Sequence, residues 1–81
     1  MVKGEKQRRN ELAIMTVANN IKKYRKKQNL TIAELANIVG VDYSQIGRME
    51  RGKVNPNISI IFDIANVLKI SPALLLEESS S

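Results

Sequence analysis

Two short helices separated by only two residues are the feature that most restricts how this chain can fold. The first is predicted over Thr31–Val39, where Thr31 and Glu34 have the spacing of a capping box. Gly40 follows it and can adopt the positive φ that ends a helix. The second is predicted over Asp42–Arg51, with an aspartate in the N-cap position. Helices joined this closely cannot pack antiparallel, so the two segments must cross steeply.

Small and apolar side chains occur where such a crossing needs them. Ala36 is small at the point where the two helices approach each other. Val41 and Ile46 can bury the turn and the second helix against Leu35 and Val39. The segment is therefore predicted to be a helix-turn-helix unit, with the second helix carrying its polar residues outward.

Three further helices are predicted from helical spacing and capping residues. One precedes the pair; it begins anywhere from Lys6 to Thr16 and ends near Gln28. Its apolar positions are Leu12, Met15, Val17, Ala18, Ile21 and Tyr24. Ser59 is predicted to cap a fourth helix, whose inward stripe is Ile61, Ile64, Ala65 and Leu68. Ser71 caps a short fifth helix with Pro72 in its first position. The expected fold class is all-α, with five helices and no strand.

The residue types that are missing exclude several functions. The 81 residues contain neither Cys nor His, which removes disulfides, thiolate metal sites and the commonest general base at neutral pH. We therefore expect no enzyme, no cofactor and no metal.

The length suits one small domain over residues 12–77, preceded by a basic arm over residues 1–11 and followed by a polar tail over residues 78–81. The arm is expected either to be disordered or to extend the first helix.

The positive charge of the chain is concentrated in its first part. The formal net charge is +5, and residues 1–31 hold nine of the thirteen basic residues but only two of the eight acidic ones. This favours a polyanionic partner, with nucleic acid first and an anionic membrane surface second. The alternative is a solvated basic helix face. No apolar run is long enough for a membrane span, and Met1–Asn10 is too polar for a signal sequence, so we expect a cytoplasmic protein.

The segment Leu30–Pro56, LTIAELANIVGVDYSQIGRMERGKVNP, resembles the phage-repressor-like (Cro/C1-type, XRE) helix-turn-helix regulators. The residues that carry the resemblance are Ala36, Gly40, Ile46, Glu50, Gly52 and Pro56 at these spacings. The similarity extends from Ile21 to Leu76. It implies a compact lambda-repressor-like domain and a small dimeric DNA-binding regulator of transcription. The family includes phage repressors, restriction–modification controller proteins and antitoxins.

The second helix of the pair is the expected reader of DNA sequence. A step of 100° per residue from the inward Ile46 places hydrogen-bonding side chains on the opposite face. Base contacts are predicted for Tyr43, Ser44, Gln45 and Arg48. The alternative is an ordinary solvated helix face. Gly47 also falls on the outward side, where it either lets the helix sit deeper in the groove or is simply tolerated at an exposed position.

Residues around this helix are expected to contact DNA phosphates or to brace it. Phosphate contacts are predicted for Thr31, Arg51, Lys53, Asn55, Lys22 and Lys26. The resemblance implies that the inward Glu50 pairs with Arg25 of the first helix. The chain departs from many relatives at Ile32, because a glutamine commonly begins that helix and an isoleucine cannot form its hydrogen bonds.

Surplus apolar residues near the C-terminus suggest a second surface. Phe62 falls on the side of the fourth helix that is expected to be exposed to solvent, and residues 74–76 are three leucines in a row. A homodimer interface is predicted with Phe62, Ile60 and Leu74, which implies a pseudo-palindromic operator. The alternative is a monomer with a loosely covered core.

A different class of function is an antitoxin-like module whose main partner is a protein, contacted through Lys3–Arg9 and the Phe62 surface. No acidic contact to a polymerase is identified.

Overall fold

A computed structural model of the chain describes residues 9–78, which contain five α-helices and no strand. The helices are α1 (Glu11–Lys27), α2 (Ile32–Val39), α3 (Tyr43–Glu50), α4 (Ile58–Leu68) and α5 (Pro72–Leu76). The all-α prediction is confirmed, and α1 begins within the predicted range. Most of the predicted basic arm (residues 1–8) and of the polar tail (residues 79–81) lies outside the described residues.

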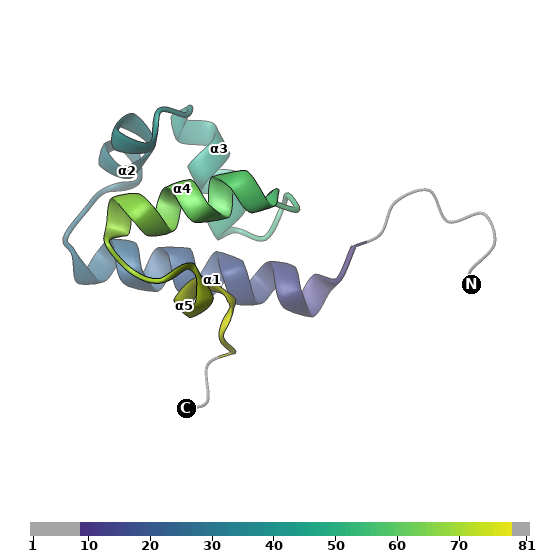
Figure 1. Cartoon of the computed structure of the whole chain (residues 1–81). Coiled ribbons are helices and arrows are strands. Elements are labelled where there is room, and N and C mark those ends of the chain that lie inside the picture. Colours follow the sequence, from purple (N-terminus) through teal and green to yellow (C-terminus); the bar gives the residue numbers. More distant parts are fainter. Residues whose placement is uncertain (1–8, 79–81) are drawn as a thin grey trace, which may run out of the picture.

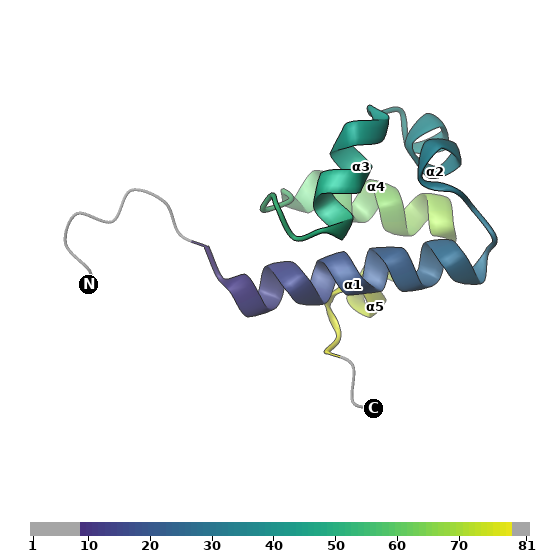
Figure 2. The same ribbon diagram turned by 180° about the vertical axis from the view of Figure 1, so that it is seen from behind.

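The long helix α1 forms the base on which α3, α4 and α5 pack (Figure 1). In Figure 1, α5 lies in front of α1 and α3 lies behind α4, and the order is reversed when the molecule is seen from behind in Figure 2. Helix α1 therefore runs between α5 on one side and α3 on the other, and it contacts both. Helices α2 and α3 pack on each other, and α2 also contacts α4.

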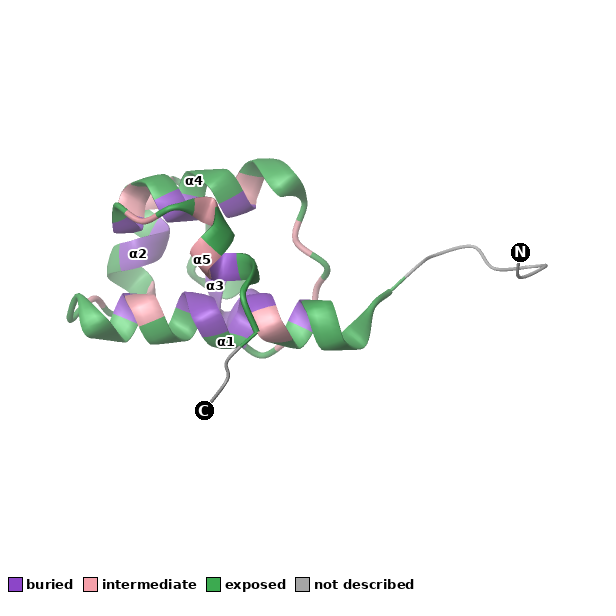
Figure 3. Cartoon of the chain, turned by 60° about the horizontal axis from the view of Figure 1, so that its bottom comes forward, coloured by how far each residue is buried: buried purple, intermediate pink, exposed green. Residues whose placement is uncertain are grey.

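The core lies where the five helices meet, and each helix contributes at least one fully buried side chain. These side chains are Ile21, Leu35, Ile46, Ile64, Leu68 and Leu75. Figure 3 shows buried positions on the sides of the helices that face one another and exposed positions on their outer sides. Because no core side chain is aromatic, this small domain depends on close packing of branched aliphatic residues.

The predicted helix ends of the helix-turn-helix unit are present. The Thr31 hydroxyl accepts a hydrogen bond from the backbone N–H of Glu34 at 3.0 Å, and the Glu34 carboxylate accepts one from the N–H of Thr31 at 2.8 Å. Gly40 ends α2 with φ = 91°, a conformation that side chains rarely adopt. Ser71 and Pro72 begin α5 as predicted.

Two apolar residues predicted for the inner stripe of α1 are on its outside. Leu12 is 66% exposed and Met15 is 40% exposed, whereas Ile14 is buried. The prediction followed apolar spacing from Leu12, but Leu12 precedes the buried Ile21 by nine residues, or two and a half turns, and so lies on the opposite side of the helix. Met15 packs instead against Gly52, beyond the end of α3.

The start of α4 is also earlier than predicted. Asn57, not Ser59, is its N-cap, and the Asn57 side-chain oxygen accepts a hydrogen bond from the N–H of Ile60 at 2.9 Å. Both residues are good N-caps, and Asn57 leaves Ser59 exposed in the first turn. The inward stripe itself is correct, because Ile61 and the other three residues predicted for it are all buried.

A buried amide on α1 fixes the C-terminal helix. The side-chain NH2 of Asn20 donates to the carbonyl of Leu75 at 2.9 Å and to the carbonyl of Glu77 at 2.8 Å. Helix α5 has only five residues, too few to be stable alone, so its position depends on the burial of Leu75 and on this amide. At the C-cap of α1, the Gln28 amide donates to the carbonyl of Leu68.

We expect Asn20→Ala to lower the free energy of unfolding by about 1–3 kcal/mol, because it leaves two carbonyls near the core without their donor. Urea denaturation of the two proteins measures this difference. The neighbouring Asn19→Ala is a matched control, since Asn19 is exposed, and it should change stability by less than about 0.5 kcal/mol. Equal effects of the two substitutions would contradict the assigned role of Asn20.

Candidate nucleic-acid interface

Helix α3 has a buried side and an exposed face. Ile46, Met49 and Glu50 are buried, and Gly47 is covered as well. The exposed side chains are those of Tyr43, Ser44, Gln45, Arg48 and Arg51. At 100° per residue, Ser44 and Arg48 lie at the centre of the exposed face. All four predicted base-contact residues are thus available to a partner.

A buried ion pair holds α3 against α1. Nε of Arg25 lies 2.7 Å from one carboxylate oxygen of Glu50, and Nη2 of Arg25 lies 2.9 Å from the other. Nη1 of Arg25 donates to the carbonyl of Leu30, just before α2, at 2.7 Å. The hydrogen bond to Glu50 is the main cause of the raised pKa of Arg25, which therefore stays charged in the fold. The ion pair implied by the resemblance is present.

The arginines of α3 differ from the other described arginines in having no partner. Arg9 pairs with Glu11 at 2.8 Å, and Arg25 is fully engaged with Glu50 and Leu30. Within residues 9–78, the side chains of Arg48 and Arg51 form neither a hydrogen bond nor an ion pair. The uncompensated guanidinium groups of the described chain are therefore both on the exposed face of α3.

Gln45 lies at the edge of the exposed face that borders α4. Its side-chain oxygen accepts a hydrogen bond from the N–H of Asp42 at 3.2 Å, which leaves the NH2 group of Gln45 to face outward as a donor. Gln45 and Arg48 also line a cleft of about 290 Å³ between α3 and the start of α4. The rest of the cleft is formed by Met49, Val54, Asn55, Pro56, Asn57 and Ile60. The cleft thus brings the predicted base contacts next to Asn55, a predicted phosphate contact.

The predicted anion site at the start of α2 is partly occupied. The capping box uses the hydroxyl and the N–H of Thr31 and the N–H of Glu34. Only the N–H groups of Ile32 and Ala33 in the first turn have no helical acceptor, and the Glu34 carboxylate lies beside them. A phosphate at this end of α2 would meet a negative charge that the sequence prediction did not take into account.

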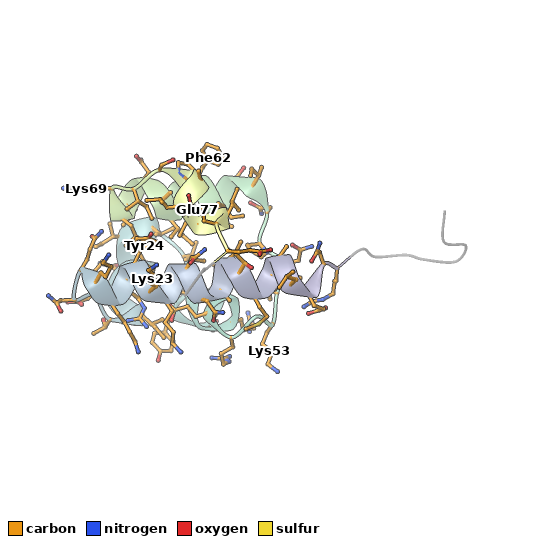
Figure 4. All side chains as sticks on the ribbon, turned by 90° about the horizontal axis from the view of Figure 1, so that it is seen from below. Lys23, Tyr24, Lys53, Phe62, Lys69 and Glu77 are labelled. Carbon is orange, nitrogen blue, oxygen red and sulfur yellow. The ribbon has the colours of Figure 1, made fainter. Side chains whose placement is uncertain are left out.

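The lysines divide between two sides of the domain. Lys22 and Lys26 are exposed on the side of α1 from which Arg25 reaches α3. The ammonium groups of Lys23 and Lys27 instead lie 5.2 and 5.5 Å from the centre of the Tyr24 ring. Figure 4 shows Lys53, which is exposed after α3, on the α3 side of α1. Lys22, Lys26 and Lys53 thus remain candidates for phosphate contacts.

Two features near α3 were not predicted from the sequence. Gly47, predicted to be exposed, is covered, and the guanidinium of Arg51 lies beside it. Nη2 of Arg9 donates to the carbonyl of Gly52 at 3.4 Å, next to the contact between Met15 and Gly52. The turn that follows α3 is therefore tied to the start of α1. No sequence signal could have revealed this, because Arg9 lies in a polar stretch without periodicity.

The predicted dimer residues do not form one surface. Phe62 is 53% exposed, and in Figure 4 it lies on the opposite side of α1 from Lys53. Ile60, however, packs against the core and lines the cleft beside Arg48, so it is not adjacent to Phe62. Leu74 is only partly exposed. Ile58, one turn before Phe62 on α4, is 60% exposed and was not predicted. Of the three surplus leucines, Leu76 is the exposed one, at 50%.

Two further findings concern the described residues alone. Within residues 9–78, no group of three or more His, Cys, Asp or Glu side chains is arranged to hold a metal ion. None of the five helices has both the length and the apolar character that a membrane crossing requires.

Comparison with known proteins identifies the family. Residues 21–75, more than half of the chain, match the helix-turn-helix family HTH_3. The chain belongs to the HTH_3 helix-turn-helix family. The matched HTH_3 region includes Arg25, Glu50 and both helices of the steeply crossed pair, in agreement with the resemblance inferred from the sequence.

Related HTH_3-like proteins are found in archaea and bacteria. An uncharacterized HTH-type transcriptional regulator of Archaeoglobus fulgidus is 40% identical over 60 residues, which are 72% of this chain and 84% of that protein. The HTH-type transcriptional regulator SinR of Bacillus subtilis is 35% identical over 63 residues, which are 76% of this chain and 57% of SinR. The chain therefore spans little more than half the length of SinR.

Two solved structures are similar to the fold described here. A crystal structure of SinR in complex with DNA has a TM-score of 0.71 and 34% identity, and the match covers 75% of this chain and 98% of that one. The restriction–modification controller protein C.AhdI of Aeromonas hydrophila has a TM-score of 0.74 and 29% identity, with 76% and 94% of the two chains covered.

We expect Glu50→Ala to lower the free energy of unfolding by about 3–5 kcal/mol, because it leaves the charge of Arg25 buried without a partner. Replacing both residues, as Arg25→Met with Glu50→Leu, should restore much of this loss, since no buried charge remains. Chemical denaturation measures both variants. Glu11→Ala removes the partner of an exposed arginine and should leave the transition close to that of the wild type. A mild effect of Glu50→Ala would show that water reaches the Arg25 guanidinium.

Proposed function

We propose that this chain is a sequence-specific double-stranded DNA-binding regulator of transcription, with α3 in the major groove. The observation that carries the proposal is the pair of unpartnered guanidinium groups, Arg48 and Arg51, on a helix fixed from behind by Arg25 and Glu50. The similarity to SinR, solved in complex with DNA, and to other HTH-type transcriptional regulators supports it.

Base recognition is assigned to Tyr43, Ser44, Gln45 and Arg48. Arg48 lies at the centre of the exposed face, and a guanidinium can donate two hydrogen bonds to O6 and N7 of a guanine. The outward NH2 group of Gln45 is a donor for a base acceptor in the same groove. Tyr43 and Ser44 occupy the first turn of α3, and the first turn of a recognition helix is the part that reaches the bases.

Phosphate contacts position the domain without reading sequence. We assign them to the exposed groups around α3, which are Lys22, Lys26, Thr31, Arg51, Lys53 and Asn55. Thr31 would contribute through the first turn of α2, against the opposing charge of Glu34. The side of α1 that carries Lys22 and Lys26 is the side that faces α3, so one duplex could contact both helices.

A homodimer on a pseudo-palindromic site is the second part of the proposal. Ile58 and Phe62 lie one turn apart on the exposed side of α4, and Leu76 is exposed on α5. Phe62 lies on the opposite side of α1 from Lys53, so a contact through Phe62 could pair two copies while both α3 helices remain available to DNA. A two-fold dimer would place the two α3 helices about 34 Å apart, one turn of DNA. Access to operator DNA would place the protein in the cytoplasm.

Selection of bound duplexes from a random pool tests the proposal directly. An enriched half-site that occurs twice, as an inverted repeat, is the expected result. The antitoxin-like alternative predicts the opposite pattern, with tight binding to a protein partner and no affinity for DNA. The proposal fails if no duplex binds even at low salt, where phosphate contacts are strongest.

We expect Arg48→Ala to weaken binding to the selected site by about 1–3 kcal/mol and to relax the preference at one base pair. The physical reason is the loss of a bidentate donor to a guanine. Titration of the variant with the selected duplex and with each single-base substitution of it measures both effects. If specific and random DNA lost affinity equally, the assignment of Arg48 to a base would be wrong.

Lys53→Ala is the control for charge alone. Lys53 is exposed and is assigned to a phosphate, so its removal should weaken binding to all sequences alike and reduce the salt dependence by about one counterion.

We expect Phe62→Glu to convert the dimer to a monomer, because a carboxylate at the centre of an apolar contact must be desolvated. Sedimentation equilibrium over a range of protein concentrations measures the change. Ile38→Glu places the same charge at another exposed apolar position, on α2, and should leave the oligomeric state unaltered. A wild-type protein that is monomeric at high concentration would remove this part of the proposal.

A further inference from the structure

Gly47 has no explanation within the domain. It lies in the middle of α3, where glycine destabilises a helix relative to alanine. Its backbone is helical and not left-handed, so no unusual φ requires a glycine. A packing reason is also missing. Outside its chain neighbours and the helix backbone, the one atom of the described chain within 4 Å of a methyl group built at this position is Nη1 of Arg51, at 3.2 Å.

The position of Arg51 explains why Gly47 is nevertheless covered. Arg51 is the C-cap of α3, four residues after Gly47, and its guanidinium lies beside Gly47 one turn back towards the N-terminus. Side chains on a helix lean in this direction, and the missing side chain at position 47 leaves room for the planar group. Arg51 therefore lies along the exposed face of α3 instead of extending away from its end.

The charge of Arg51 is not used within the domain. Its guanidinium forms neither an ion pair nor a hydrogen bond among residues 9–78, so no polar partner in the described fold holds it in the folded-back position. The guanidinium lies beside the central Arg48, on the face of α3 that a partner would approach. A side chain that already lies along this face has less conformational freedom to lose when it forms a directed contact.

We propose that Arg51 is a second base-reading arginine. Gly47 is a positioning residue, because its missing side chain leaves the space that the Arg51 guanidinium occupies. This inference rests on the proposed function and changes the role of Arg51 from a phosphate contact to a specificity determinant. The ligand would be the major-groove edge of a guanine, O6 and N7, near the base pair that Arg48 contacts. Gly47 acts only through Arg51, because a side chain there would displace the guanidinium by a few tenths of an ångström or more.

The test is a double-mutant cycle on DNA recognition. Arg51→Ala should weaken binding to the selected duplex by about 10- to 100-fold and should remove the preference for guanine at one base pair. Gly47→Ala should lower affinity for the same duplex by about three-fold or more when Arg51 is present, and should have no effect in the Arg51→Ala background. Thermal denaturation serves as a folding control, and Gly47→Ala should raise the midpoint because alanine favours helix.

Arg48→Ala provides the matched cycle. Successive side chains on a helix do not face each other, so Gly47→Ala and Arg48→Ala should be additive.

Three results would overturn the inference. The first is an equal loss by Arg51→Ala on specific and random duplexes, together with a smaller salt dependence, which would make Arg51 a phosphate contact. The second is a loss by Gly47→Ala that persists without Arg51, which would mean that the helix backbone itself approaches the DNA. The third is no loss by Gly47→Ala at all. In each case the wild type still selects a specific duplex, whereas failure of the proposed function leaves no selected duplex for any variant.

Discussion

One buried arginine determines where the exposed face of α3 points. Two nitrogens of Arg25 donate to the two carboxylate oxygens of Glu50, in the last turn of α3. The third nitrogen donates to the carbonyl of Leu30, just before α2 begins. A planar guanidinium can satisfy these acceptors together only in a narrow range of orientations. The pair thus connects α1 with both ends of the helix-turn-helix unit, and it fixes a direction that apolar packing around Ile46 alone would leave less defined.

The helices that could be predicted well are those whose ends are set by local chemistry. Thr31, Glu34 and Gly40 define α2 through contacts with residues at most four positions away, and such contacts can be inferred from sequence spacing. The prediction was wrong where the burial of a residue depended on contacts with distant parts of the chain. The burial of Ile14 in place of Met15 depends on which side of α1 the other helices cover, because Met15 is needed against Gly52. Sequence spacing alone carries no information about that contact.

In the candidate site, too, sequence spacing predicted the direction of most side chains but missed one contact. Stepping along α3 from Ile46 correctly separated the buried Met49 and Glu50 from the exposed Ser44 and Arg48, because a helix of eight residues leaves little freedom in direction. It placed Gly47 wrongly because helical geometry locates Cβ atoms and not the ends of long side chains. Arg51 reaches back by a full turn, and its guanidinium lies beside Gly47.

The distribution of charge partners links the fold to its proposed role. In the described chain, the arginines on α1 and just before it are paired with carboxylates, whereas the arginines of α3 are left without partners. An unpaired exposed guanidinium adds nothing to the stability of the monomer, and two on one short helix repel each other. The arrangement therefore favours a compensating charge that comes from outside the domain. A rigid helix with uncompensated donors suits a ligand that combines negative charge with a regular pattern of acceptors, and the major groove of DNA offers both.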